Sequence, residues 1–280
     1  MASQSADRYA VVGHPISHSR SPWIHHEFAK ATGQTIEYGR VDVAVADFSR
    51  FVGDFFREGG RGLNVTLPHK EAAAAFVDTL TPRAAAAGAA NTLWQQSDGV
   101  LVGDNTDGVG LLTDLMKNHG VSLANRHILL IGAGGAARGC IAPLLDQQPI
   151  SLTIANRTAD RAHSLAALFA GKGPVRARSL SDLGGTVFDI VINATSASLS
   201  GETPALAPQV IHRDTVGYDL AYGKGDTAFT IFCKVHGAKA AYTGLGMLVE
   251  QAAEAFYLWR GVKPPTEAVL RELQAMIRAI

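Results

Sequence analysis

The sequence HILLIGAGGAARG, residues 127–139, decides the fold. A short apolar run typical of a buried strand leads into the pattern G-x-G-x-x-A, which extends from Gly132 to Ala137, and a helical pattern follows. The first glycine of this pattern makes a tight turn, the second lets a pyrophosphate approach the backbone, and the third position must be small so that helix and strand can pack. The anion then binds the amides of the helix N-terminus. The stretch predicts a Rossmann-type, dinucleotide-binding unit, with a plain strand-to-helix turn as the alternative.

The residues after the second strand of this unit indicate which dinucleotide binds. Folds of this type that bind NAD usually carry Asp or Glu there, where it binds the ribose 2′-hydroxyl. In this chain the strand SLTIA, residues 151–155, is followed by Asn156 and Arg157, and Arg161 comes four residues later. Two guanidinium groups in place of a carboxylate suit a 2′-phosphate. The sequence predicts NADP, and the alternative is a solvated, basic start of a helix.

Strand patterns and helical patterns alternate along the chain, which is typical of α/β architecture. Strands are expected at RYAVVGH, TIEYGRVDV and GLNVTL before residue 105, and at HILLI, SLTIANR, DIVINAT, TVGYDL and KAAYTG after it. Only helical patterns follow residue 244, and the last of them needs a partner surface for its apolar face. We expect two α/β domains. The first is discontinuous, residues 1–106 and 244–280, because the C-terminal helices return to it, and the second is a Rossmann-type domain, residues 107–243.

Three helical patterns of the first domain are defined by their ends or faces. The stretch SPWIHHEFAKATG, residues 21–33, has Ser21 as a candidate N-cap, Pro22 at the first helical position and Gly33 at the end. The stretch KEAAAAFVDTL, residues 70–80, is expected to be helical throughout. Between them, one apolar stripe at helical spacing predicts a helix packed on the sheet, and it consists of Phe48, Phe51, Val52, Phe55 and Phe56.

The composition excludes some classes of function. The 280 residues include 25 Lys+Arg and 25 Asp+Glu, so the chain has no overall charge to hold nucleic acid or an anionic membrane surface. The two cysteines, Cys140 and Cys233, form no CxxC motif, which fits a reducing compartment. The N-terminal stretch MASQSADRYA lacks the apolar core of a signal peptide, and no apolar run is long enough to span a bilayer. We expect a cytoplasmic protein with a small-molecule partner.

The stretch NVTLPHK, residues 64–70, carries polar side chains to the end of a strand. Asn64 and Thr66 alternate with apolar residues, and Lys70 begins the next helix, where the positive end of the helix dipole disfavours an ammonium group. Ligands of open α/β sheets bind outside the carboxyl ends of the strands. Asn64 and Thr66 are therefore candidate ligand-binding residues, with solvated or capping roles as the alternative.

Other polar stretches support a binding site in the same domain. Ser17 and Ser19 follow the first strand and could bind a carboxylate or serve as turn hydroxyls. The turn GDNTDG, residues 103–108, contains two carboxylates, although Thr106 or Asp107 could also cap the following helix. AGAANT, residues 87–92, adds Asn91. No cluster of His, Cys and carboxylate residues has metal-ligand spacing, so we expect no metal.

Taken together, these motifs resemble the shikimate dehydrogenase family. The motifs that carry the resemblance occur in that family's order and extend from residue 18 to about residue 253: HSRSP, NVTLPHK, AGAANTL, GDNTDGVGLL, IGAGGAARG, NRT, NATS, YDL and GLGMLVEQAA. The resemblance implies reversible hydride transfer between NADPH and 3-dehydroshikimate, giving shikimate and NADP, a step of aromatic amino-acid biosynthesis. It also implies that the discontinuous domain is the catalytic, substrate-binding one.

The resemblance further implies roles for particular residues. Lys70 and Asp107 match the catalytic pair beside the reacting hydroxyl. The residues matching the substrate-binding positions are Ser17, Ser19, Asn64, Thr66, Asn91, Tyr222 and Gln251. Those matching the cofactor-binding positions are Gly132, Ala133, Gly134, Gly135 and Ala136 in the phosphate loop, Asn156, Arg157, Thr158 and Arg161 around the 2′-phosphate, and Leu220 and Gly244 near the nicotinamide.

The reaction gives a reason for a lysine at the disfavoured helix start. Hydride leaves a carbinol carbon only as the hydroxyl proton leaves, so a base must lie within hydrogen-bond reach of that oxygen. The helix N-terminus favours a neutral Lys70 amine and a nearby Asp107 favours the ammonium, so the two groups would titrate as a unit.

Two alternatives are a quinate/shikimate dehydrogenase of broader substrate range, and an inert NADP-sensing module, which should have lost Lys70 or Asp107. The motifs leave open whether the protein is a monomer or a homodimer.

Overall fold

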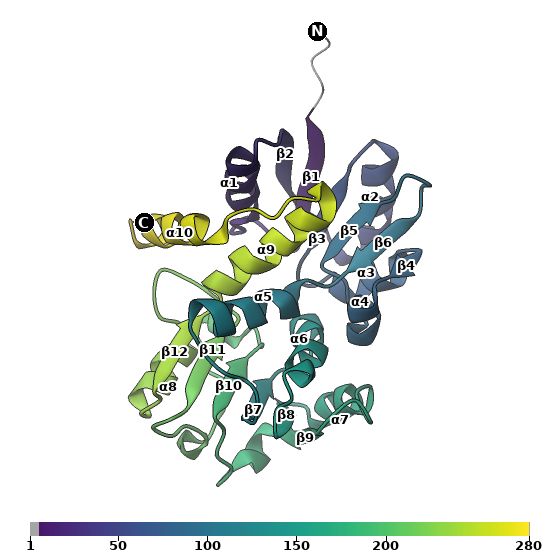
Figure 1. Ribbon diagram of the computed structural model, residues 1–280. Coiled ribbons are helices and arrows are strands. Elements are labelled where there is room, and N and C mark those ends of the chain that lie inside the picture. The colour runs from purple at the N-terminus through teal and green to yellow at the C-terminus, as the bar shows by residue number, and fades with distance from the viewer. Residues whose placement is uncertain (1–5, 280) are drawn as a thin grey trace. The chain divides into compact units, whose positions relative to one another are not determined.

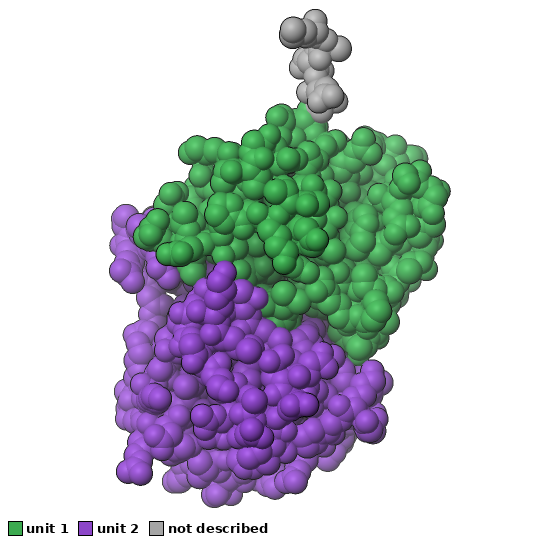
Figure 2. Space-filling view, in the orientation of Figure 1, with its two compact units in different colours: residues 1–110, 248–273 green, residues 111–247, 274–280 purple. Residues whose placement is uncertain are grey.

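The computed structural model describes residues 6–279, so the first five residues of the stretch inspected for a signal peptide lie outside the described part. The chain forms two compact units, coloured separately in Figure 2. The first extends to Gly110 and resumes at Leu248–Leu273, and the second comprises Leu111–Met247 and the residues from Gln274 onward. Both units are α/β, as the sequence predicts. The boundaries between the two units fall inside three helices rather than at the ends of elements. The domain boundaries expected from the sequence therefore stay a prediction.

The sheet of the first unit has six strands in the order β2-β1-β3-β5-β6-β4. The strands β1 and β2 are parallel, as are β1 and β3, whereas β5 is antiparallel to both β3 and β6. Their bounds are β1 Asp7–Gly13, β2 Ile36–Asp42, β3 Gly62–Val65, β4 Thr79–Leu80, β5 Thr92–Gln95 and β6 Leu101–Asp104. The antiparallel half, β5 and β6, was not expected from the sequence.

Helices complete the first unit (Figure 1). They are α1 Ser21–Thr32, α2 Phe48–Arg57, α3 Lys70–Phe76 and α4 Pro82–Ala87, with a short 3-10 turn at Val45–Asp47. The predicted stripe of α2 packs on the sheet: Phe48, Val52 and Phe55 are buried in one cluster with residues of β1 and β3. This burial of apolar surface supplies the main stabilisation of the unit.

The second unit contains an all-parallel sheet of six strands, in the order β12-β11-β10-β7-β8-β9. Their bounds are β7 His127–Ile131, β8 Ser151–Asn156, β9 Val175–Ser179, β10 Ile190–Asn193, β11 Val216–Asp219 and β12 Ala240–Thr243. Numbered within the unit, this is the order 3-2-1-4-5-6 of the Rossmann fold, so the predicted dinucleotide-binding architecture is confirmed. The order reverses between β7 and β10, where such folds bind their ligand.

The helices of the second unit flank this sheet (Figure 1). They are α6 Gly135–Asp146, α7 Ala159–Ala167 and α8 Ala228–Val235, with 3-10 turns at Leu180–Leu183, Ala197–Ser200 and Pro208–Val210. Three further helices belong partly to each unit: α5 Asp107–Thr113, which continues as a π-helical turn over Asp114–Asn118, α9 Leu245–Arg260 and α10 Thr266–Ala279. Within residues 6–279, no helix is long and apolar enough to cross a membrane.

Two local predictions were wrong. Ser21 is the first helical residue of α1 rather than its N-cap, because Arg20 takes that position and the hydroxyl of Ser19 accepts the amide of Ser21 at 3.3 Å. The helix expected over residues 70–80 ends at Phe76, since Thr79 and Leu80 pair with β6 as strand β4. The end of α1 agrees with the sequence, with Gly33 in the left-handed conformation at φ 65°.

A buried histidine lies in an aromatic cluster of the first unit. The ring of His25 in α1 stacks on Tyr38 of β2, with centroids 4.2 Å apart and planes inclined by 9°. The rings of Trp259 and Phe28 lie at 5.4 and 6.0 Å. Burial lowers the pKa of His25 to about 3, and neither ring nitrogen has a hydrogen-bond partner among residues 6–279. The histidine is therefore neutral in the folded protein at any pH above that value.

This burial predicts a pH dependence of stability. Between pH 6.5 and about 3 an unfolded chain protonates His25 and the folded chain does not, so stability falls as the pH falls through this window. One such group contributes at most about 1.4 kcal/mol per pH unit. His25→Phe should remove this slope, as measured by urea unfolding at pH 7.0, 5.5 and 4.5. Tryptophan fluorescence reports on the first unit alone, because Trp23, Trp94 and Trp259 all lie in it.

The matched control is His26→Phe, since His26 is the next residue but is exposed. It should leave the slope in place. An unchanged slope in His25→Phe would show that the buried histidine does not couple folding to protonation.

Candidate active site

The two predicted catalytic residues meet in the first unit. The Nζ of Lys70 donates to the Oδ2 of Asp107 at 2.5 Å, and the side chains are only 14% and 5% exposed. Lys70 is the first residue of α3, and Asp107 is the first residue of α5. Because little water reaches the pair, the charges interact strongly and hold one geometry. The structure thus brings together an ammonium donor and a carboxylate acceptor that lie 37 residues apart in sequence.

The position of Lys70 is fixed by its neighbour. His69 is the N-cap of α3, and its ring stacks on Phe48 with centroids 4.6 Å apart. Its Nε2 donates to the backbone oxygen of Val43 at 2.8 Å. His69 is buried, so this contact leaves the start of α3 little freedom. The histidine has a structural role here.

Asn91 connects the catalytic pair with two other predicted site residues. Its Nδ2 donates to the Oδ1 of Asp107 at 2.8 Å and lies 3.4 Å from the Oε1 of Gln251. Its Oδ1 accepts the backbone amide of Thr106 at 2.9 Å. Gln251, on α9, also lies 3.5 Å from the hydroxyl of Thr106. The Lys70 cluster, as it is called below, consists of Lys70, Asn91, Thr106, Asp107 and Gln251. Its members come from α3, the loop before β5, the turn between β6 and α5, α5 and α9.

Asn64 lies beside this cluster and is not solvated. Its Oδ1 accepts from the hydroxyl of Tyr38 at 2.7 Å, and its Nδ2 donates to the backbone oxygen of Asn91 and to the hydroxyl of Thr92, each at 3.3 Å. All four residues of β3 are buried. The exposed polar face considered as an alternative is therefore excluded for Asn64. Thr66 follows β3 and lies against the backbone of Gly13.

The serines form a turn after β1. Arg40 of β2 donates to the backbone oxygen of Ser17 and lies 3.4 Å from that of Ser19. The backbone amide of Ile16 donates to Asp42 at 3.3 Å. Ser17 is exposed and Ser19 partly buried, and among residues 6–279 no hydrogen bond joins either of them to the Lys70 cluster. Their role in binding a carboxylate stays a prediction.

The glycine loop of the second unit has the geometry that a phosphate requires. Gly132 has φ 115°, which favours glycine, and a Cβ there would lie 3.0 Å from the backbone oxygen of Ala194. A Cβ on Gly134 would meet nothing within 4 Å, so the backbone borders open space at the second glycine. No side chain caps the first turn of α6, and Ala137 is fully buried against the sheet. The amides that follow Gly134 are thus available to an anion.

The residues after β8 suit a 2′-phosphate. Asn156 ends the strand and its Nδ2 donates to the backbone oxygen of Thr158 at 3.0 Å. Arg157 precedes α7 and Arg161 lies in its first turn, and both are exposed. Within the described residues, neither arginine forms an ion pair with a carboxylate of the chain. The pair therefore fits NADP, because two uncommitted guanidinium groups replace the carboxylate expected for NAD.

A buried network that the sequence did not predict orders the ends of β10 and β11. Asp219 is fully buried, and burial raises the pKa of its carboxyl against the hydrogen bonds that lower it. It accepts from Ser198, Thr227, Asn193 and the backbone amide of Ala221 at 2.5 to 3.1 Å.

The two residues predicted to lie near the nicotinamide, Leu220 and Gly244, contact each other close to this network. The amide of Leu220 donates to Asn193, and a Cβ on Gly244 would lie 2.2 Å from the Leu220 oxygen. Gly244 is thus needed for close backbone packing. Tyr222, in the same loop, is partly buried, and its role in the substrate pocket stays a prediction.

Comparison with known proteins covers nearly the whole chain. Three family models match: the shikimate dehydrogenase substrate binding domain over residues 11–93, shikimate / quinate 5-dehydrogenase over 114–211, and the shikimate 5′-dehydrogenase C-terminal domain over 244–274. A curated shikimate dehydrogenase (NADP⁺) of Aeromonas salmonicida is 57% identical over 268 residues, which is 96% of this chain and 97% of the relative. The chain belongs to the shikimate dehydrogenase family.

Solved structures agree with this family. An Ael1 enzyme from Pseudomonas putida is 46% identical, has a TM-score of 0.89, and the match covers 96% of this chain and 98% of that one. Shikimate 5-dehydrogenase from Thermus thermophilus, in complex with NADP(H) and shikimate, is 33% identical with a TM-score of 0.84, over 97% of this chain and 99% of the other. The family resemblance drawn from the motifs is confirmed.

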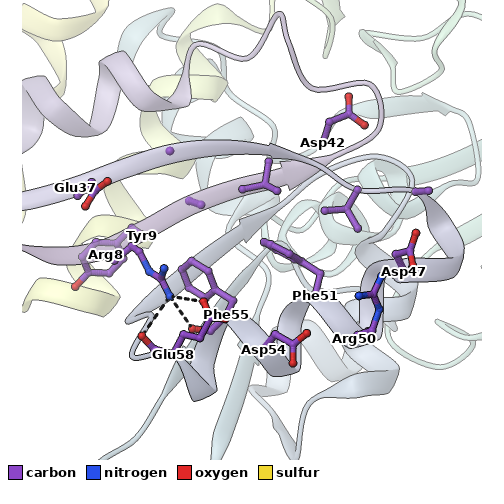
Figure 3. Close-up of a pocket in the computed structure, with 15 residues that line it drawn as sticks. Arg8, Tyr9, Glu37, Asp42, Asp47, Arg50, Phe51, Asp54, Phe55 and Glu58 are labelled. Atoms are coloured by element: carbon purple, nitrogen blue, oxygen red, sulfur yellow. Dashed lines mark hydrogen bonds and ion pairs between the residues drawn. The ribbon is translucent and has the colours of Figure 1, made fainter.

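A separate cavity of about 510 Å³ lies between α2 and the strands β1 and β2 (Figure 3). Arg8 lines it, donating to the backbone oxygens of Phe55 and Glu58 at 3.3 Å and to the Glu58 carboxylate at 3.4 Å. Arg50 is paired with Asp47 at 2.7 Å. None of the residues predicted to bind substrate or cofactor lines this cavity. Its arginines are committed to carboxylates of the chain, so it has no part in the chemistry expected of this family.

Proposed function

We propose that this protein is an NADP-dependent shikimate dehydrogenase, which reversibly reduces 3-dehydroshikimate to shikimate. The observation that carries the proposal is the buried contact of 2.5 Å between Lys70 and Asp107, in a chain 57% identical over 268 residues to a curated enzyme of that name. An NADP-sensing module would have no reason to keep a buried acid–base pair.

The residues of the second unit fit the cofactor. The amides following Gly134 would bind the pyrophosphate, and Asn156, Arg157, Thr158 and Arg161 would bind the adenosine ribose and its 2′-phosphate. When bound, NADPH supplies the hydride for reduction. The assignment is supported by the open space at Gly134 and by the exposed Arg157 and Arg161, which have no ion-pair partner among residues 6–279.

The Lys70 cluster would handle the proton. During reduction the substrate oxygen gains a proton as the hydride reaches its carbon, and the Lys70 ammonium is the donor within the cluster. During oxidation the neutral amine accepts the proton instead. Asp107 orients the Lys70 side chain and keeps its charge balanced in a nearly dry setting, and Asn91 fixes the Asp107 carboxylate through the contact of 2.8 Å.

The other polar side chains of the first unit would bind the rest of the ring. Asn64, Thr66, Asn91 and Gln251 offer amide and hydroxyl groups to the substrate hydroxyls. Ser17 and Ser19 would bind the substrate carboxylate with their hydroxyls. Because Asn64 and Asn91 already have fixed partners in the chain, their side chains are held in defined orientations. Such preorganisation is what selects one arrangement of hydroxyl groups.

The proposal is tested by following the absorbance of the reduced nicotinamide, with shikimate and quinate each supplied with NADP and with NAD. The expected result is rapid reduction of NADP by shikimate and weak activity in the other three combinations. Comparable rates with quinate would favour the quinate/shikimate dehydrogenase of broader range. Absence of activity with every pair would contradict the proposal.

Lys70→Ala should lower kcat for shikimate oxidation by at least roughly 10²-fold, which is typical for loss of an acid–base group. The KM for shikimate should change less, because other side chains bind the ring. Steady-state kinetics with saturating NADP measure both constants. Lys30→Ala is the control, since Lys30 lies on the exposed end of α1 in the same unit. A Lys70→Ala enzyme with nearly normal kcat would remove Lys70 from the chemistry.

Cofactor preference should depend on Arg157 and Arg161. Because two charge-assisted contacts to one phosphate add only partly, we expect wild type to prefer NADP over NAD by roughly 10²–10⁴-fold in kcat/KM. Arg157→Ala combined with Arg161→Ala should raise the KM for NADP sharply and leave NAD kinetics nearly unchanged. Asn156→Asp added to that pair should favour NAD and further disfavour NADP.

Arg213→Ala is the matched control, because this arginine of the second unit is 93% exposed and is remote in sequence from the phosphate loop. This substitution should leave kcat/KM for NADP and for NAD unchanged. Equal losses of NADP and NAD activity in the double variant would show that Arg157 and Arg161 do not bind a 2′-phosphate.

A further inference from the structure

Arg83 connects three elements of the first unit around a buried carboxylate. It lies in α4, and its Nε and Nη2 donate to the two carboxylate oxygens of Asp104, each at 2.7 Å. The same Nη2 donates to the Oε1 of Glu254 on α9 at 3.0 Å. Asp104 ends β6 and is 2% exposed. A planar guanidinium that binds one carboxylate with two parallel bonds has a fixed orientation, so Arg83 sets where Glu254 lies relative to Asp104.

On one side, this network leads to Asp107. The Oδ1 of Asp104 also accepts the backbone amide of Asn105 at 2.7 Å and the hydroxyl of Thr81 at 2.5 Å. The side chain of Asn105 in turn accepts the backbone amide of Asp107 at 3.1 Å. Each of these contacts is buried or partly buried. The Asp104 carboxylate therefore fixes the turn from which α5 begins and from which the Asp107 side chain extends.

On the other side, the network leads to Gln251. Glu254 follows Gln251 by three residues on α9, so the two side chains extend from the same face of the helix. The contact to Glu254 therefore fixes the rotation of α9 about its own axis, and with it the direction in which the Gln251 side chain extends. The Oε1 of Gln251 lies 3.4 Å from the Nδ2 of Asn91, and the same nitrogen donates to Asp107 at 2.8 Å. Two series of contacts therefore start at Arg83, one through Asp104 to Asp107 and one through Glu254 to Gln251. Both end at Asn91, which contacts Asp107 and Gln251.

We propose that Arg83 is a positioning residue for the reaction, which sets the spacing between Asp107 and Gln251 through Asp104 and Glu254. This role rests on the proposed function, because it assumes that Asp107 and Gln251 act on the substrate. Arg83 contacts no residue of the Lys70 cluster directly, and its effect passes through the turn before α5 and through the face of α9. Lysine cannot replace it, since a single ammonium group cannot hold both oxygens of Asp104 in one plane and Glu254 as well.

The role is tested with Glu254→Ala in two backgrounds, wild type and Gln251→Ala. Glu254 is partly exposed, with a side-chain exposure of 21%, so its removal should leave the fold intact. In wild type, Glu254→Ala should raise the KM for shikimate by about 5-fold or more, a typical size for coupled side chains, and leave the KM for NADP unchanged. In the Gln251→Ala background the same substitution should change the KM for shikimate by less than about 2-fold, because the residue through which it acts is gone.

Arg83→Lys is the second variant, because it disrupts both the paired bonds to Asp104 and the bond to Glu254, while keeping a positive charge beside buried Asp104. It should lower kcat as well as raise the KM for shikimate, since Asp107 is then also misplaced. Asp47→Ala is the control, as it removes an exposed carboxylate that an arginine contacts at 2.7 Å in the same unit. It should change neither constant in either background.

The outcomes separate the two claims. If Glu254→Ala has the same effect on the KM for shikimate in both backgrounds, or no effect in either, the positioning role is overturned while the proposed function stands. If Arg83→Lys retains wild-type kcat and KM, the positioning role is likewise overturned. If wild type itself does not oxidise shikimate with NADP, the proposed function falls and the positioning role falls with it.

Discussion

The contact between Lys70 and Asp107 is the interaction on which the arrangement of the first unit depends. An ammonium group placed at a helix N-terminus and largely withdrawn from water is unfavourable by itself, because both the helix dipole and desolvation act against its charge. A carboxylate at 2.5 Å compensates for this, but only if it is held in place. The surrounding structure meets that requirement. His69 anchors the start of α3, Asn91 holds the Asp107 carboxylate, and the Arg83 and Asp104 pair holds the turn before α5.

Burial explains why each of these polar side chains has several hydrogen-bond partners. The Asp104 carboxylate and the amides of Asn64 and Asn91 would each cost free energy if left without partners, so each makes more than one hydrogen bond in the structure. Several satisfied groups in a low-dielectric setting leave few alternative arrangements. The same principle applies in the second unit, where buried Asp219 accepts four hydrogen bonds and so fixes the loops that follow β10 and β11.

Much of the fold could be predicted from the sequence because its signals are local. The phosphate loop requires glycine at Gly132, and the stripe on α2 follows from helical spacing alone. β9 was missed because Val175–Ser179, VRARS, is a partly exposed edge strand with two arginines and no apolar run. β5 and β6, TLWQ and LVGD, were missed because each adjoins a polar turn sequence, AGAANT or GDNTDG, and carries no longer apolar run. Of the site, the Lys70 pair could be predicted from motifs, whereas Arg83 could not, because it lies in none of those motifs and only the fold brings it to Asp104 and Glu254.

The central claim is that Lys70 and Asp107 act as one unit on one proton. The most direct measurement is a double-mutant cycle on kcat/KM for 3-dehydroshikimate, with Lys70→Ala, Asp107→Ala and both together. If the two side chains act as a unit, the double variant should be no slower than the slower single variant, within about 3-fold, because the first substitution already removes the function of the pair. If the two losses multiply, so that the double variant is slower by the product of the single effects, the residues act independently and the claim is contradicted.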